Sequence, residues 1–351
     1  MTKKQTLKSV ALMLLFVLCV GTRLQAQFIT TWVTTDGTIT IPTLATSGVY
    51  NYTVTWTNLT TTGLGNGTIS GRTGNHTITG LTNGNTYSIS ISGAFPQFFM
   101  GLGFPVNPQA QKLRTIVQWG TNAWTSMNAA FARCVNLTYP ATTTDNPNLA
   151  GVTDMSGMFI DCRLFNGNIG SWNTSTITNM RTMFYNCNAF NQNISTWNTA
   201  NVTDMNAIFY NCSVFNQSLN TWNTANVTDM NTMFYGCSVF NQNISAWNTA
   251  NVTNMSTMFY ECGSFNSNIG SWNTARVTNM EVMFRDALVF NQNISAWNTA
   301  NVTNMRGMFQ GATLFNQNIG AWNTANVTNM LSMFQGATVF NQNIGAWNTA
   351  K

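Results

Sequence analysis

Charged side chains are scarce in this sequence. They make up 7% of its residues, whereas a typical soluble domain carries about 25%, and Asn, Thr, Ser and Gln supply the polar surface instead. The net charge of +5 overstates the basicity of an exported form, because Lys3, Lys4, Lys8 and Arg23 all lie in the first 26 residues and removing them leaves +5 − 4 = +1. A nearly neutral protein without a cluster of basic residues has no surface for a phosphate backbone, so we expect no nucleic-acid partner.

Histidine is almost absent, and its scarcity excludes most catalytic chemistry. His76 is the single histidine, so the repeats described below cannot contain a catalytic triad, a Cys–His pair or a His-based metal site. The nine carboxylates form no obvious acid–base pair for hydrolysis. We therefore expect a protein that is not an enzyme and has no cofactor and no metal site.

Long hydrophobic runs are also missing, except near the start of the chain. Basic residues are followed there by an apolar run from Val10 to Val20 and a short polar stretch that ends at Ala26. This layout predicts a signal peptide over residues 1–26, with cleavage after Ala26. The run is too short to span a bilayer comfortably, so we expect no transmembrane segment and a secreted or cell-surface location.

The C-terminal part of the chain is built from repeats. From Val152 onward, the pattern V-T-N/D-M-x-x-M-F-x-x-C/A-x-x-F-N-x-x-I-x-x-W-N-T-x-x occurs eight times at a period of 25 residues, without insertion or deletion. A unit of this size cannot close a core alone, whereas stacked units bury a continuous one. Residues 152–351 are therefore predicted to form a solenoid of eight repeats.

Spacing within the repeat predicts its local structure. Val152, Met155 and Cys162 belong to a set of apolar residues three to four apart, which favours a short helical turn facing inward, with Thr153 as its N-cap. Trp172 ends a limb that we expect to be extended and to pair with its neighbours as parallel strands. The predicted fold class is therefore a mixed α/β repeat solenoid of the leucine-rich-repeat kind.

The segments that flank the repeats differ from them. Trp124, Met127, Phe131 and Cys134 reproduce the repeat spacing 28 residues early, which predicts a degenerate capping repeat over 116–151. Residues 27–110 hold short alternating runs separated by Gly, Asn and Thr, as is typical of a small all-β sandwich of the immunoglobulin, PKD or fibronectin type. At the other end, the sequence stops at Lys351 without a capping repeat, so we expect a partial gene product or a last coil that a partner covers, including self-association.

Several positions of the repeat define columns along the stack. Asn166 and Asn173 begin two columns that contain asparagine in all eight copies, which we interpret as structural ladders rather than ligand sites. A third column holds a cysteine in five copies and alanine in the last three. Exchange with alanine favours buried thiols, and disulfides between neighbours or metal binding are the alternatives. The cysteines of this column are Cys162, Cys187, Cys212, Cys237 and Cys262.

A further column is the candidate binding site. It follows the first phenylalanine of each repeat and contains a tyrosine in each of four successive repeats. Tyrosine is favoured in recognition surfaces because it combines a rigid apolar ring with a polar tip. The competing interpretation is that each ring only covers the coil beside it. The tyrosines are Tyr185, Tyr210, Tyr235 and Tyr260, and the same column holds Ile160, Arg285, Gln310 and Gln335.

The repeat resembles that of a known group of surface proteins. The stretch N-V-T-D-M-N-T-M-F-Y-G-C-S-V-F-N-Q-N-I-S-A-W-N-T at 226–249 and its copies are similar to the BspA-like leucine-rich-repeat proteins, in the branch with 25-residue repeats also found in Mycoplasma lipoproteins. Residues 78–92 resemble part of the PKD- or fibronectin-type sandwich that precedes such repeats. The resemblance implies export and a role in adhesion or community interaction, and it supplies no catalytic residues.

These inferences lead to one leading hypothesis and one alternative. We expect an exported, non-catalytic adhesion or ligand-binding protein that recognises a host or community protein or glycan through its repeat face. Many weak identical contacts along a rigid rod would add up through effective concentration. The alternative is a structural protein whose solenoids stack end to end into a surface layer or fibre.

Overall fold

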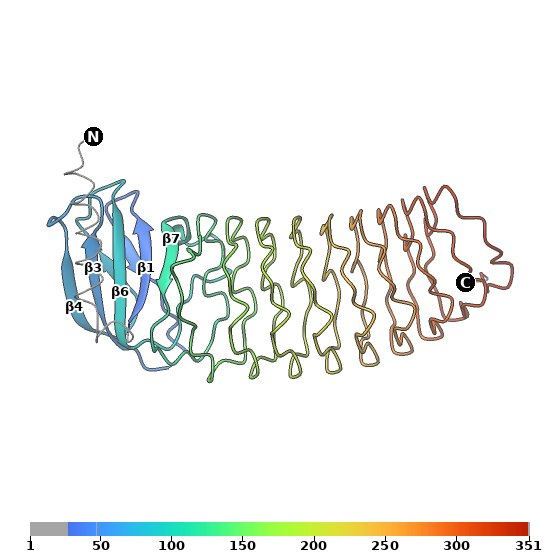
Figure 1. The fold of residues 1–351 in the computed structure, drawn as a ribbon, viewed down its shortest axis with the longest axis horizontal. Coiled ribbons are helices and arrows are strands. Elements are labelled where there is room, and N and C mark those ends of the chain that lie inside the picture. The colour runs from blue at the N-terminus through green and yellow to red at the C-terminus, as the bar shows by residue number, and fades with distance from the viewer. Residues whose placement is uncertain (1–26, 47, 350–351) are drawn as a thin grey trace.

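The computed structural model describes residues 27–46 and 48–349. The predicted signal peptide lies outside these residues. An N-terminal β-sheet region is followed by a long row of coils that all run in the same direction (Figure 1). One hydrophobic core is continuous from Phe28 in the first strand to Trp347 in the last coil.

The N-terminal region is an antiparallel five-stranded sheet with a small second sheet. The order of strands in the large sheet is β4-β3-β6-β1-β7, and β2 pairs with β5 in the small one. Apolar and polar residues alternate along these strands, so that each strand has one buried face. In β6, Tyr87, Ile89 and Ile91 are fully buried, while the residues between them are only partly covered. The strands are β1 Phe28–Val33, β2 Ile39–Ile41, β3 Asn51–Asn58, β4 Gly67–Arg72, β5 His76–Ile78, β6 Thr86–Ala94 and β7 Leu113–Gln118.

The sheet and the coils are joined without a gap. A short 3-10 helix, η2 (Pro108–Gln111), leads into β7, which pairs with β1 at the edge of the large sheet. Thr115 of β7 forms a parallel bridge with Thr138. The ring of Phe28 lies 5.6 Å from that of Trp119 and 5.1 Å from that of Trp124. Side chains of the sheet thus provide the surface on which the first coil packs.

The repeats stack in register, coil upon coil. The amide of Met155 donates to the carbonyl of Asn179 (3.0 Å), and the amide of Phe159 donates to that of Met183 (3.0 Å). Equivalent side chains meet, as in the pair Trp197 and Trp222, whose ring centroids are 6.4 Å apart with an interplanar angle of 4°. The segment before the repeats joins the stack in the same way, since Phe131 donates to the carbonyl of Met158 (2.9 Å).

The predicted mixed α/β, leucine-rich-repeat-like architecture is wrong. Residues 27–46 and 48–349 contain no α-helix. Neighbouring repeats are linked by parallel bridges of a single residue each, such as that between Asp154 and Asn179, rather than by strands. The regular strands lie in the N-terminal region, and they are antiparallel.

Backbone conformation explains why no helical turn forms. Gly157 and Asp161 both have a φ of 60°, and the equivalent residues of every other repeat are also left-handed, which interrupts a right-handed helix. Amide groups alternate along this limb: that of Met158 bonds within its own coil, to Met155, while that of Phe159 bonds to the next coil. Half of the amides that a helix would use internally therefore hold the stack together.

Thr153 does not act as the predicted N-cap. The neighbouring Asp154 accepts a hydrogen bond from the amide of Ser156 through its carboxylate (2.8 Å). Asparagine at the Asn173 position makes the same kind of bond, here with the amide of Ser175 (3.1 Å). These are Asx turns, in which a short polar side chain fixes a tight bend. The corners of the coil are therefore set by Asp and Asn rather than by helix caps.

Candidate functional site

The four tyrosines of the predicted site form a ladder of stacked rings. Centroids are 4.2 Å apart between Tyr185 and Tyr210, 4.3 Å between Tyr210 and Tyr235, and 4.6 Å between Tyr235 and Tyr260. The interplanar angles are 4°, 11° and 5°. All four side chains are half-buried. We call this set the tyrosine ladder.

Burial affects the ionisation of the ladder. Desolvation, aided by the neighbouring ring of Tyr210, raises the pKa of Tyr185 to about 12. Burial also raises the pKa of Tyr235 and of Tyr260. These three hydroxyls are therefore neutral at physiological pH and can both donate and accept hydrogen bonds.

Stacking decides which parts of the tyrosines a ligand can reach. Each inner ring has a neighbouring ring against both faces, and the guanidinium of Arg285 lies 5.1 Å from the centroid of the Tyr260 ring. A sugar therefore cannot lie flat on the inner rings. The ladder presents ring edges and a row of hydroxyl groups. The stacked rings also cover the coils beside them, as stated in the competing interpretation of this column.

Both asparagine columns bond to backbone groups, as the structural interpretation states. Asn166 accepts hydrogen bonds through Oδ1 from the amide of Asn191 (3.0 Å) and from Nε2 of Gln192 (3.0 Å), both in the next coil. The column that begins at Asn173 forms the Asx turns described above. Both columns therefore use their amide oxygens to satisfy backbone groups.

The cysteine column consists of buried, unpaired thiols. All five of its cysteines, like Cys134 upstream, are free and fully buried. Cys187 donates through Sγ to the carbonyl of Phe159 in the preceding coil (3.0 Å). Burial raises the pKa of Cys187 well above its usual value. Ala287 occupies the same position with no exposure, so the site selects a small apolar residue, as the buried-thiol interpretation states.

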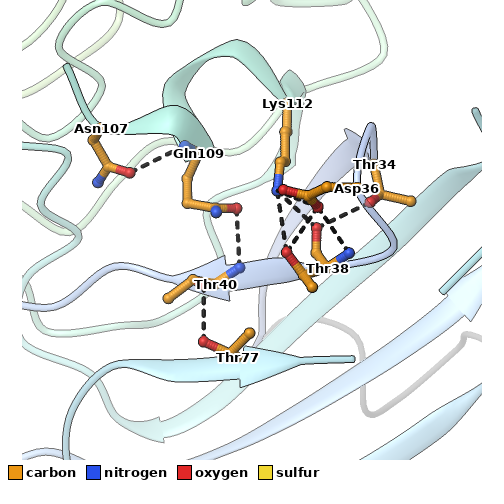
Figure 2. A network of polar contacts seen from close by, with 8 residues as sticks. All are labelled: Thr34, Asp36, Thr38, Thr40, Thr77, Asn107, Gln109 and Lys112. Carbon is orange, nitrogen blue, oxygen red and sulfur yellow. Dashed lines mark hydrogen bonds and ion pairs between the residues drawn. The ribbon is translucent and has the colours of Figure 1, made fainter. Parts of the chain in front are cut away.

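A second polar cluster lies in the N-terminal region and is shown in Figure 2. The ammonium group of Lys112, whose side chain is 2% exposed, lies 2.8 Å from Asp36, which is 53% exposed, and also donates to the carbonyl of Thr38 (3.0 Å). Its hydrogen bond is the main cause that lowers the pKa of Asp36 to about 2. Gln109 of η2 accepts from the amide of Thr40 in β2 (3.0 Å). The cluster fastens η2 to the loop between β1 and β2, so we assign it a structural role.

A groove that the sequence did not predict lies where the regular repeats begin. It consists of two cavities, of about 280 Å³ and about 610 Å³, which share Asn168 and Gln192 as lining residues. Tyr139 and Pro140 line the first cavity, and Trp172 lines the second. The one visible signal was Gly167, because most other repeats have glutamine at that position. We call this feature the junction groove.

Metal sites and membrane-spanning helices are both missing from the part of the chain that the structure describes. No group of three or more His, Cys, Asp or Glu side chains is placed to hold a metal ion there. Nor does any helix within 27–46 and 48–349 have the length and hydrophobicity that crossing a bilayer would require.

Comparison with known proteins places the repeats in a family. The family model described as "Mycoplasma protein of unknown function, DUF285" matches residues 125–234, 216–306 and 268–351. Neither the curated proteins nor the solved structures contain a match. The match agrees with the Mycoplasma side of the resemblance and does not extend to its BspA-like side. Because the matched segments together cover well over half of the sequence, the chain belongs to the DUF285 family of repeat proteins.

Proposed function

We propose that this protein is an exported, non-catalytic binding protein that adheres to a protein partner through the tyrosine ladder. Export is inferred from the sequence of residues 1–26 alone. The absence of catalytic function is inferred from the single histidine and the lack of paired acids. The observation that carries the binding proposal is the row of four half-buried tyrosines, stacked in register across four consecutive coils.

The geometry of the ladder favours a protein over a glycan at this position. Stacked rings leave edges and hydroxyls for contact, and these suit a surface that offers both apolar side chains and backbone groups. Tyrosine edges held rigidly lose little conformational entropy on binding. Four equally spaced contacts on a rigid stack also favour an elongated partner.

The test is binding of the full chain to immobilised fibronectin, laminin, collagen and fibrinogen. One variant carries Tyr→Ser at all four ladder positions. The matched control carries Gln310→Ser and Gln335→Ser, which change the same column outside the ladder. We expect the ladder variant to bind at least about tenfold more weakly and the control to bind as the wild type does.

Two outcomes would overturn the proposal. Equal binding by all three proteins would remove the ladder as the binding surface. A chain that binds none of the four proteins, but grows in size with concentration in light scattering, would favour the assembly of a surface layer or fibre instead. Circular dichroism of each variant shows whether the stack has been retained.

A further inference from the structure

The junction groove lies where the regular pattern of the repeats is interrupted. Gly167 is the only residue of its column without a side chain, and the ring of Tyr139 lies against it. A Cβ atom at position 167 would be 2.5 Å from Cγ of Tyr139. Glycine is therefore required for the aromatic ring to form the wall at the start of the groove.

The groove has uncharged walls. None of the side chains that line the two cavities carries a charge. Amide groups come from Asn166, Asn168, Gln192 and Asn193, and a hydroxyl comes from Thr196. Aromatic groups at Tyr139 and Trp172 complete the lining. This combination of aromatic surface and side chains that both donate and accept hydrogen bonds matches the hydroxyls and C–H faces of a neutral sugar.

Hydrogen-bonding capacity in the groove is left open at Asn168. In the next coil Asn193 accepts from the amide of Ser195 (3.0 Å), and in a later coil Asn268 accepts from that of Gly270 (3.0 Å). The Asn168 side chain makes no hydrogen bond with any residue that the structure describes, and it is exposed. Gln192 donates through Nε2 to Oδ1 of Asn166. The side-chain carbonyl oxygen of Gln192 is therefore available to accept a hydrogen bond.

A second irregularity lies beside the groove. The other tryptophans of the column, such as Trp197, donate through Nε1 to a carbonyl in the preceding coil (3.0 Å). Nε1 of Trp172 makes no such bond to a carbonyl among the described residues and interacts instead with the hydroxyl of Tyr139. The start of the stack thus combines an aromatic wall, an unused amide and the departure of Trp172 from its column, features that are not all present in any later coil.

From these observations we infer that the junction groove is a second binding site, which takes a short neutral oligosaccharide. The combined space lies in the range of small-molecule sites, and two cavities in series fit a chain of sugar units better than a single one. The absence of charge in the lining disfavours uronic acids and other anions. This site is independent of the tyrosine ladder in position and in ligand.

The experiment uses the full chain and a panel of neutral hexasaccharides of glucose, mannose, galactose and N-acetylglucosamine, with a hexamer of galacturonic acid as the charged comparison. The groove variant is Asn168→Ala/Gln192→Ala. The matched control, Asn268→Ala/Gln292→Ala, removes the same side chains from a regular coil. Gln192 and Gln292 each donate one hydrogen bond of 3.0 Å to the asparagine column, to Asn166 and Asn266 respectively. Both variants therefore lose one hydrogen bond to that column.

We expect at least one neutral hexasaccharide to bind the wild type and the control equally, and the groove variant about tenfold or more weakly. The side-chain amide signals of Asn168 and Gln192 should shift on titration in nitrogen-15 NMR spectra. Four results would overturn the inference: no binding of any neutral hexamer, preference for the galacturonic acid hexamer, equal loss in both variants, or unchanged amide signals. The four-tyrosine variant should keep its saccharide binding, which separates this site from the proposed adhesive surface.

Discussion

The indole N–H of Trp197 donates to the carbonyl oxygen of Ile169, 28 residues earlier in the chain, at a distance of 3.0 Å. The same bond joins Trp222 to Ile194 (3.1 Å) in the next coil. Each of these bonds adds a second donor to a carbonyl that also accepts from an amide of its own coil, and it fastens one coil to the coil before it. Tryptophan at these positions therefore contributes its N–H group as well as its size.

The first prediction concerns this bond. Trp222→Phe should lower the free energy of unfolding by about 2 kcal/mol, because it removes packed volume and the indole hydrogen bond to the carbonyl of Ile194, which keeps only the amide of Trp197 as a donor. Trp172→Phe is the control, since its Nε1 donates to no carbonyl among the described residues, and its loss should be smaller by about 1 kcal/mol. Urea denaturation measures both, and equal losses would show that the bond contributes nothing.

The second prediction concerns the buried thiols. Ellman's reagent at pH 8 should modify none of the six cysteines from Cys134 to Cys262 in the folded protein. The reason is that burial raises the pKa of thiols such as Cys187 and Cys212, and the thiolate is the reactive form. All six should react once urea unfolds the chain. Mass spectrometry that finds a disulfide between two of these cysteines in native protein would contradict the prediction.

The third prediction concerns backbone strain. Val282 has a φ of 45°, a conformation that is costly for a β-branched residue, whereas the equivalent residue of the next coil is Gly307. Val282→Gly should raise the free energy of unfolding by up to about 1 kcal/mol, the relief of strain exceeding the gain in chain entropy of the unfolded state.

Gly307→Val is the opposite change and serves as its comparison. A Cβ at position 307 would lie 2.9 Å from Cγ1 of Val282, so we expect a loss of about 2 kcal/mol. Thermal unfolding of both variants tests the pair. If Val282→Gly destabilises as much as Gly307→Val, the left-handed conformation carries no strain.

The fourth prediction concerns alkaline pH. A raised pKa in the folded state, as in Tyr185 at about 12, means that the folded protein keeps its phenolic proton after the unfolded chain has begun to lose it near pH 10. Stability should therefore be independent of these groups below pH 10 and should fall as the pH rises from 10 to 12. Tyr→Phe at all four ladder positions keeps the rings and removes the titration.

Chemical denaturation at several pH values between 9 and 12 compares the two proteins. Tyr52, whose pKa burial also raises to about 12, is present in both and cancels. A steeper loss of stability in the wild type supports the assignment. Parallel curves would mean that the ladder hydroxyls ionise alike in both states.

The in-register stacking of the repeats was predicted from the sequence, whereas the predicted helical turn within each repeat was wrong. Columns of Trp, Phe and Met require like residues to meet along the stack, and Trp197 and Trp222 do so. Spacings of three to four residues favoured a helical turn, yet a limb with left-handed residues buries the same side chains. Threonine at position 182 gave no sign of its φ of 52°, because β-branched residues normally avoid that region.

Some of the missed signals were present in particular residues. Asp161, Asn186, Asn211 and Gly236 occupy one left-handed column, and these residue types tolerate that conformation best. Asp or Asn at the Asp154 position likewise indicated an Asx turn. The row of tyrosines was visible in the sequence, but the face-to-face contact that covers the rings depends on the distance between coils. That distance follows from backbone bonds which the repeat pattern alone does not specify.

One series of main-chain bonds between coils joins a residue to the one 24 positions further on, as from Met155 to Asn179 and from Met180 to Asp204. The main-chain bonding at one junction between repeats is thus the same as at the next. Loss or gain of a whole 25-residue unit would therefore leave each new neighbour with the same backbone partners. The length of the rod, and with it the reach of whatever it carries, can therefore change by whole repeats without redesign of the fold.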